Sequence, residues 1–398
     1  MRSVEEALAA ILATARPTRS EILPLDRCAG RVPADRRVTA AVDVPPFDNS
    51  SMDGFALRAA DAPGELRLVG EVAAGVAALP VLEAGTVVRI MTGAPMPPGA
   101  DSVAPLEVVT ESEGVVRVPA VERGAHVRPA GGDTRAGDVV ELTPAPLSAA
   151  GVAVLASLGV GELEVHRRPR VAILSTGDEL RAPGEPLGPG QIYDANSFSL
   201  AAAVLEAGGV PVELPRAPDD EEEIERILAA AAGEADVIVA SGGVSVGRYD
   251  HVRTVLERAG SLDFWRIRVQ PGKPLAFGSI HGRPVIGVPG NPVSALVTFE
   301  LFVRPLLRAM LGLAGTGRVT LRAVAGERIG KDLERRAYLR VVLRREGDGF
   351  VAAPAGGQGS NQLRPLAAGN ALLVVPEGEA AAEPGSTYDA LLIGELER

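Results

Sequence analysis

The sequence predicts a multidomain α/β plus β protein, in which a parallel, helix-covered sheet is combined with regions of short strands. Residues 170–312 alternate apolar, strand-like runs with segments of helical periodicity, which is typical of a three-layer α/β domain with a parallel sheet. From residue 40 to about 142, and again from 318 to 398, short Val- and Leu-rich runs are separated by Gly and Pro. Such runs indicate small, mostly β domains.

The elements follow in chain order. Residues 3–16 begin with Ser3 and carry Glu6 three places later, which is the capping-box pattern of a short amphipathic helix. A second, connecting helix is expected within residues 146–160. We therefore assign residues 1–40 and 142–168 to an N-terminal helical and linker domain, 41–141 to a mostly β domain, 169–312 to the α/β domain, and 313–398 to a small β barrel or sandwich.

Composition excludes several classes of protein. The formal net charge of −11 argues against a general surface for nucleic acid or anionic membranes, because phosphate binding needs concentrated Lys and Arg. The single cysteine, Cys28, excludes an internal disulfide, and the four histidines are not at zinc-ligand spacing. The first residues carry Glu5 and Glu6 in place of a basic region followed by an apolar core, and no segment approaches about 18 uninterrupted apolar residues, so we expect neither secretion nor membrane insertion. We expect a cytoplasmic protein.

Residues 235–250, ADVIVASGGVSVGRYD, are the most informative segment. The apolar run suits a strand buried on both faces of a parallel sheet, and the glycines after it remove side chains where the backbone bends or approaches a ligand. Gly242, Gly243, Gly247 and Asp250 then lie beyond the carboxyl end of the strand, where open parallel sheets bind ligands.

Carboxylates follow other strands of the same region. Asp178 and Glu179 come after RVAILSTG, Asp219 and Asp220 after VELPRAP, and Asp250 after the glycine turn. If these groups share one edge of the sheet, their oxygens suit a hard cation such as Mg²⁺. A structural interpretation of Asp219 competes with this one and is compatible with it, because Asp219 stands where it would cap the helix that begins with DDEEE.

Other segments offer sites for anions or ligands. In VPGNPVSALVTFELF, Asn291 and Pro292 suit a helix start with Ser294 in its first turn, where free backbone N–H groups receive oxyanions. Lys273 in PGKP adds a cation, although the segment is no P-loop. In the β regions, Asp53, Thr92 and Ser360 occupy polar loops that, taken alone, are ordinarily turns.

Taken together, these segments resemble one family. DNSSMDGFA, MTGAPMPPGAD, GGDTRAGD, STGDEL, SGGVSVG with its Asp, PGKP, VPGNPVS and GGQGS occur in the order seen in the MoeA family of molybdopterin molybdenumtransferases, which includes the gephyrin E domain. The resemblance covers nearly the whole chain. It implies a central molybdopterin-binding α/β domain, a C-terminal β barrel, and insertion of molybdate into adenylylated molybdopterin with release of AMP and a requirement for Mg²⁺.

The resemblance also implies roles for single residues. Glu179, Asp219 and Asp250 would hold Mg²⁺ around the phosphoanhydride, with Asp53 and Thr92 completing the catalytic set. Lys273, Ser294, Arg340 and Ser360 would hold molybdate, since cationic donors and hydroxyls suit a tetrahedral oxyanion. The remaining substrate contacts would come from Ser241, Gly242, Gly243, Ser245, Gly247, Pro289, Gly290 and Asn291. Family members are typically homodimers, whose partners are molybdopterin adenylyltransferase and downstream molybdoenzymes or their chaperones.

The sequence departs from the family at one position, where QPGKP stands in place of KPGKP. Gln270 removes a local positive charge, so we expect weaker capture of molybdate and greater sensitivity to salt. Molybdate and tungstate carry the same charge and nearly the same size, so residue types do not separate them. Two alternatives keep the same fold: a molybdopterin adenylyltransferase, which would leave the β regions without a purpose, and a non-catalytic scaffold for protein partners.

Overall fold

The computed structural model describes residues 1–76, 78–218, 220–242 and 251–396. The chain divides into two compact units, one formed by Met1–Ser20 with His166–Arg398 and the other by Glu21–Val165. In the described part of the chain, none of the helices combines the length and apolarity needed to cross a membrane.

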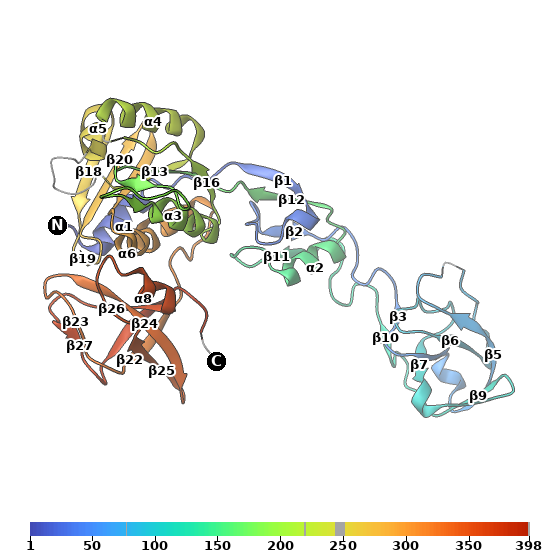
Figure 1. Ribbon diagram of the computed structural model, residues 1–398. Helices are drawn as coiled ribbons and strands as arrows, with labels where there is room; N and C mark the ends of the chain where they lie inside the picture. Colours follow the sequence, from blue (N-terminus) through green and yellow to red (C-terminus); the bar gives the residue numbers. More distant parts are fainter. Residues whose placement is uncertain (77, 219, 243–250, 397–398) are drawn as a thin grey trace. The chain divides into compact units, whose positions relative to one another are not determined.

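The α/β domain is built on a six-stranded sheet (Figure 1). Its strands, in spatial order, are β16 (Val210–Glu213), β13 (Arg170–Ser175), β17 (Val237–Ser241), β21 (Arg283–Val288), β20 (Pro274–Ile280) and β18 (Ser261–Arg266). The first four are parallel to one another, and β20 runs antiparallel to both of its neighbours. The expected parallel sheet is therefore present, with one antiparallel strand, β20, between β21 and the edge strand β18.

Helices cover both faces of this sheet because alternate residues of its central strands point to opposite sides. Val237 and Val239 enter one apolar core, whereas Ile238 and Ala240 enter the other. The first core is closed by α1 (Val4–Leu12), α3 (Ala195–Glu206), α6 (Pro292–Thr298) and α7 (Arg304–Met310), and the second by α4 (Glu221–Glu234) and α5 (His251–Ala259). This arrangement confirms the predicted three-layer domain.

Local sequence explains where these helices begin. Ser3 and Glu6 form the expected capping box of α1. The side chain of Asp220 caps α4 by accepting from the N–H of Glu223, so the cap falls one residue after Asp219, which lies outside the described residues. The helix expected to start at Pro292 gives way to a π-helical turn at Phe299–Val303, after which helix α7 follows.

The C-terminal region forms a closed barrel. Its strands are β22 (Thr320–Ala325), β24 (Arg336–Glu346), β25 (Gly349–Pro354), β26 (Ala371–Val375) and β28 (Thr387–Leu392). The ring closes because β24 pairs with β26 as well as with β25. Of the two architectures that the sequence left open, the barrel is therefore the one found. Beside it lie β19 (Val269–Gln270), which pairs with β24, the pair β23 (Ile329–Gly330) and β27 (Ala381–Ala382), and α8 (Leu363–Ala368).

The unit Glu21–Val165 contains a second six-stranded sheet in the order β7 (Ser102–Pro105), β4 (Gly54–Leu57), β6 (Thr86–Ile90), β5 (Gly64–Val72), β9 (Val115–Val118) and β8 (Thr110–Ser112). Apolar cores lie on both faces of this sheet. Cys28 is buried in a separate small core with Leu155 of α2 (Ala149–Ser157).

Short pairs of strands complete the chain. They are β1 (Ser20–Pro24) with β12 (Glu162–His166), β2 (Arg37–Thr39) with β11 (Val139–Glu141), β3 (Asn49–Ser50) with β10 (Val127–Arg128), and β14 (Leu180–Arg181) with β15 (Ile192–Tyr193). Three single turns of 3-10 helix lie at Leu25–Arg27, Ala59–Asp61 and Leu106–Val108. The last strand pair lies directly beside the site described next.

Candidate functional site

A pocket of about 470 Å³ opens at the carboxyl edge of the parallel sheet. The ends of β13 and β17, the start of α3 and the loop before α6 supply most of its wall. It brings together five residues predicted from the sequence, namely Glu179, Ser241, Gly242, Gly290 and Asn291. The predicted residues Asp219, Gly243, Ser245, Gly247 and Asp250 lie outside the described residues.

Two glycines shape this pocket. Gly242, at the start of the glycine turn, has a φ of +91°, and a Cβ there would meet the carbonyl oxygen and Oγ1 of Thr176, both at 3.0 Å. Gly177 has a φ of +139°, and a Cβ there would meet a carboxylate oxygen of Glu179 at 2.5 Å. Glycine is therefore required at both positions, and at Gly177 it lets the carboxylate of Glu179 fold over its own turn.

The loop that precedes α6 is hydrogen-bonded to a loop of the C-terminal barrel region. Asn291 is the N-cap residue of α6, but its side chain makes no capping bond to the helix. Its Nδ2 instead donates to Oγ of Ser360, at 3.1 Å. Ser294 is buried in the first turn of α6, Pro289 is buried in the preceding loop, and Lys273 is exposed. The structure thus joins VPGNP directly to GGQGS.

Arg340 is the most unusual charged group of this region. Its side chain lies in β24 and is only 1% exposed. Nη2 donates to the carbonyl oxygens of Gly357 and Gly359, at 2.9 and 3.1 Å, while Nε has no partner among the described residues. Burial lowers the pKa of Arg340, and no carboxylate of the described chain forms an ion pair with it. Among the described residues, the guanidinium is therefore a buried cation held by carbonyl dipoles alone.

Asp53 and Thr92 lie in the other unit and are bonded to each other. The backbone N–H and the hydroxyl of Thr92 both donate to Oδ1 of Asp53, at 2.7 and 2.9 Å. The backbone bond, followed by the hydroxyl bond, lowers the pKa of Asp53. The carboxylate is exposed, so it is held ionised and open to a ligand.

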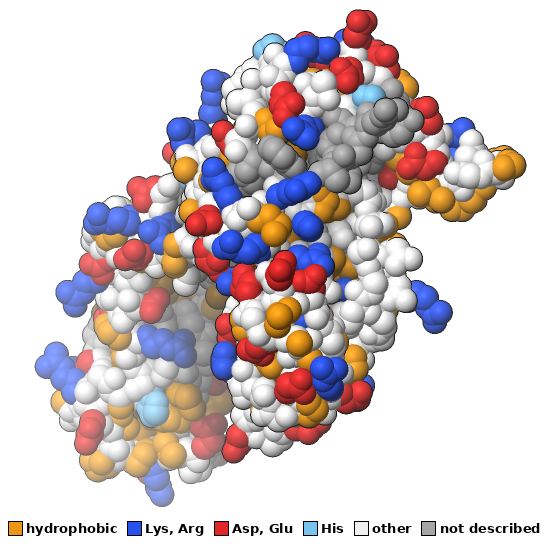
Figure 2. Space-filling view, turned by 90° about the vertical axis from the view of Figure 1, so that its left-hand side faces the viewer, with side chains coloured by type: hydrophobic (Ala, Val, Ile, Leu, Met, Phe, Trp, Pro, Cys, Tyr) orange, Lys and Arg blue, Asp and Glu red, His pale blue; other side chains and the backbone are white. Residues whose placement is uncertain are grey.

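Figure 2 shows acidic, basic and apolar side chains interspersed over one face of the molecule. In the described ranges, no group of three or more His, Cys, Asp or Glu side chains is arranged to hold a metal ion. Glu179 is the one predicted metal ligand that falls within those ranges.

Comparison with known proteins identifies the family of this chain. Family models match three consecutive parts of the chain: the MoeA N-terminal region (domain I and II) at residues 2–159, a probable molybdopterin binding domain at 172–309, and the MoeA C-terminal region (domain IV) at 322–393. Molybdopterin molybdenumtransferase 2 of Mycobacterium tuberculosis is 38% identical over 394 residues, which cover 95% of this chain and 96% of the relative. The chain belongs to the MoeA family.

Other MoeA relatives agree. Molybdopterin molybdenumtransferase of Haemophilus influenzae is 41% identical over 300 residues, which cover 74% of each chain. A crystal structure of the molybdopterin biosynthesis MoeA protein from Pyrococcus horikoshii OT3 superimposes with a TM-score of 0.82 at 29% identity and covers 98% of this chain and 100% of its own. These findings confirm the family and the fold class predicted from the sequence.

Sequence reasoning missed several polar residues of the MoeA pocket. Asp194 and Asn196 at the start of α3, Ser175 at the end of β13, and Asn361 beside Ser360 all line it. The segment YDANS carried a signal, since Asp194 precedes a helical pattern at the N-cap position. Its partners come from other strands, however, and the segment gives no sign of them.

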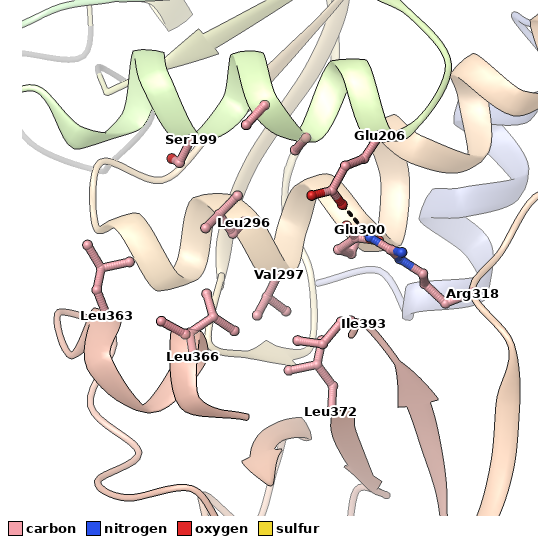
Figure 3. Close-up of a pocket in the computed structure, with 13 residues that line it drawn as sticks. Ser199, Glu206, Leu296, Val297, Glu300, Arg318, Leu363, Leu366, Leu372 and Ile393 are labelled. Atoms are coloured by element: carbon pink, nitrogen blue, oxygen red, sulfur yellow. Dashed lines mark hydrogen bonds and ion pairs between the residues drawn. The ribbon is translucent and has the colours of Figure 1, made fainter. Parts of the chain in front are cut away.

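A second, more apolar pocket of about 450 Å³ lies within the same unit (Figure 3). Leu296, Leu363 and Leu372 line it from α6, α8 and β26. At one end Arg318 forms a bidentate ion pair with Glu300, with both distances at 2.7 Å, and also contacts Glu206. None of the residues predicted for catalysis or substrate binding lines this pocket.

Proposed function

We propose that this MoeA protein is a molybdopterin molybdenumtransferase, which inserts molybdate into adenylylated molybdopterin and releases AMP in molybdenum cofactor biosynthesis. The curated relatives that span most of the chain carry that name. The observation that carries the proposal is Arg340, a buried guanidinium without a carboxylate partner in the described chain, next to the loop that Asn291 joins to the pocket.

The oxyanion site follows from this charge. A buried cation that is balanced only by carbonyl dipoles is electrostatically incomplete, and a tetrahedral dianion would complete it. Ser360 follows Gly359, whose carbonyl oxygen accepts from Arg340. The hydroxyl of Ser360 accepts from Asn291, which lines the pocket. Lys273 adds an exposed ammonium. These groups, with Ser294, are the proposed holders of molybdate.

The acidic side of the site would serve the leaving group. Glu179 lines the pocket with a carboxylate that folds over Gly177, and carboxylate oxygens are the donors that Mg²⁺ prefers. Glu179, Asp219 and Asp250 would hold the cation, whose charge would offset the charge that develops on the phosphate of AMP. Asp53, kept ionised by Thr92, is proposed to complete the catalytic set.

A homodimer is the proposed assembly. Ile192 and Tyr193, which line the pocket, are 54% and 45% exposed, and Phe198 and Leu205 of α3 are 60% and 55% exposed. Several large apolar side chains exposed along one helix and the strand before it indicate an interaction surface. Asp53 and Thr92 are proposed to act across the dimer interface. Molybdopterin adenylyltransferase would supply the substrate, and molybdoenzymes or their chaperones would accept the product, in the cytoplasm.

The test is AMP release from adenylylated molybdopterin by the purified protein, with and without Mg²⁺ and molybdate. We expect release that depends on molybdate, and a loss of kcat of about 10²–10³-fold in Glu179→Gln, comparable to the removal of one electrostatic group from an active site. Asp178→Asn is the matched control, because Asp178 is adjacent and exposed but does not line the pocket.

Two outcomes would replace the proposal. Formation of adenylylated molybdopterin from ATP and free molybdopterin, without molybdate-dependent release of AMP, would make the protein an adenylyltransferase. If folded, dimeric protein catalysed neither reaction, the non-catalytic scaffold would become the best account of the protein.

A further inference from the structure

The start of α3 holds together the ends of three neighbouring strands. Asp194, the N-cap residue, accepts from the N–H of Ser197 at 3.0 Å and from its hydroxyl at 2.5 Å. Oγ of Ser175, at the end of β13, donates to the same carboxylate at 3.3 Å. This fixes the end of β13 to the helix, and the other two strands depend on a different residue.

That residue is Asn196, the second residue of the helix, which is only 8% exposed. Its Nδ2 donates to Oγ of Ser241 at 2.7 Å and to the carbonyl oxygen of Gly290 at 2.8 Å. Ser241 ends β17 and leads directly into the glycine turn, while Gly290 belongs to the loop that follows β21. A primary amide has two N–H groups, and both are used here.

The two loops that Asn196 holds, at Ser241 and at Gly290, form neighbouring parts of the wall of one pocket. A Cβ built on Gly290 would lie 3.9 Å from Cα of Gly242, so the two loops lie close together. Asn196, Ser241, Gly242 and Gly290 all line the 470 Å³ pocket. A shift of either loop would therefore move the backbone on which a substrate rests.

The carbonyl oxygen of the Asn196 side chain indicates that the residue is present for its two N–H groups. Oδ1 of Asn196 is buried and has no hydrogen-bond partner among the described residues. Unsatisfied buried polar atoms are uncommon in native proteins and call for an explanation. Aspartate has the same shape but no N–H group, and Ala has neither. Of these three side chains, only the amide of asparagine can donate a hydrogen bond to each loop. Its oxygen is left buried without a partner among the described residues.

We propose that Asn196 is a positioning residue of the transferase site. It holds the end of β17 and the Gly290 carbonyl in the register that adenylylated molybdopterin requires, and it does so through its two N–H groups. This inference rests on the proposed function, since that function defines the substrate that the two loops receive. Asn196 itself is not assigned a contact with the reacting atoms.

The experiment compares Asn196→Asp and Asn196→Ala with the wild-type chain. Steady-state AMP release gives kcat and KM, and equilibrium titration gives the Kd of adenylylated molybdopterin. Because a displacement near 1 Å in an active site costs on the order of 100-fold in rate, we expect kcat to fall about 100-fold in both variants, with a smaller change in Kd. Asn196→Ser, whose hydroxyl keeps one donor, should fall between them and the wild type.

Asn370 provides the matched control. It is also 8% exposed, and its Nδ2 also donates two hydrogen bonds, here to the carbonyl oxygens of Leu343 and Glu395, but it lies in the C-terminal barrel region. Asn370→Ala should lower the melting temperature while leaving kcat per folded molecule unchanged. If Asn196→Ala fails to fold, Asn196→Ser at a temperature below its transition carries the same comparison.

The outcomes separate the two claims. Loss of kcat in the Asn196 variants, after correction for the folded fraction, supports positioning. Wild-type kcat in folded Asn196→Ala overturns it, and so does a loss confined to Asn196→Asp, because that would be an effect of charge. Should the wild type bind and convert no adenylylated molybdopterin, the proposed function itself fails, and the inference fails with it.

Discussion

Oε1 of Gln270 accepts a hydrogen bond from the backbone N–H of Asp332, at 2.8 Å. Gln270 belongs to β19, which pairs with β24 of the barrel, so its side chain joins the α/β domain to the barrel loop that follows β23. Resemblance to the MoeA family placed a lysine here, and a lysine has no acceptor for that N–H. Gln270 therefore combines the loss of a charge with the gain of a structural bond.

Substitution Gln270→Lys should change affinity and stability in opposite directions. We expect tighter binding of molybdate, because the added ammonium lies three residues before Lys273 in the chain. We also expect a lower melting temperature, because the Asp332 N–H loses its acceptor. Isothermal titration with molybdate at two salt concentrations measures the first effect. An unchanged Kd would contradict the proposed consequence of the missing charge.

The ionisation of Asp53 should depend on the hydroxyl of Thr92. Thr92→Val removes the side-chain bond and leaves the backbone bond, so the pKa of Asp53 should rise part of the way toward its ordinary 3.8. Thr92→Ser keeps the hydroxyl and should leave that pKa where it is. Because folding lowers the pKa of Asp53, its ionised carboxylate stabilises the folded state above pH 3.8. This stabilisation is lost as the pH falls through the pKa that Asp53 has in the folded state. NMR titration of the carboxyl carbon measures the shift directly; equal pKa values in the Val and Ser variants would refute it.

The ion pair at the end of the apolar pocket should contribute strongly to stability. Glu300 and Arg318 have side chains that are 12% and 17% exposed. Glu300→Gln leaves a largely buried guanidinium without its main partner, which typically costs about 3–5 kcal/mol in the free energy of unfolding. Asp389→Asn breaks an exposed pair with Arg322 and should cost less than about 1 kcal/mol. Equal losses of unfolding free energy in the two variants, measured by urea denaturation, would show that burial does not explain the contribution of the Glu300–Arg318 pair.

Alkaline pH should weaken the fold through Tyr338. Burial raises the pKa of Tyr338 from 10.0 to about 12, although Arg336 opposes the shift. Between these values the unfolded chain releases the phenolic proton while the folded chain keeps it, so stability falls as the pH rises from 10 to 12. The difference corresponds to roughly 2–3 kcal/mol. Tyr338→Phe should lack this component, and a wild-type profile that parallels the variant's would contradict it.

Local patterns made much of the fold predictable. Val237–Ser241 is buried at every position, so its apolar run had the composition of a central parallel strand. The glycine at 242 was recognisable because its backbone conformation excludes other residues. Ser3 stands at a helix start, where a short polar side chain satisfies free N–H groups. Each of these features depends on residues close together in the chain.

The features that the sequence did not reveal depend on distant partners. Asn196 contacts Ser241 and Gly290, which are 45 and 94 residues away. The π-helical turn at Phe299–Val303 lies in an apolar run that reads as one continuous helix, and Glu300 in that turn meets Arg318 beyond the end of α7. The bond between Gln270 and Asp332 likewise joins two domains. Family resemblance named candidate site residues, but only coordinates show which of them meet.

The central claim is tested most directly by the molybdate dependence of AMP release from adenylylated molybdopterin. The purified wild-type chain is mixed with substrate and Mg²⁺, and AMP is measured over a range of molybdate concentrations, with Arg340→Gln alongside. We predict release that rises to saturation with molybdate in the wild type and needs much higher concentrations in the variant. Release that is independent of molybdate, or equally sensitive to it in both proteins, would contradict the account.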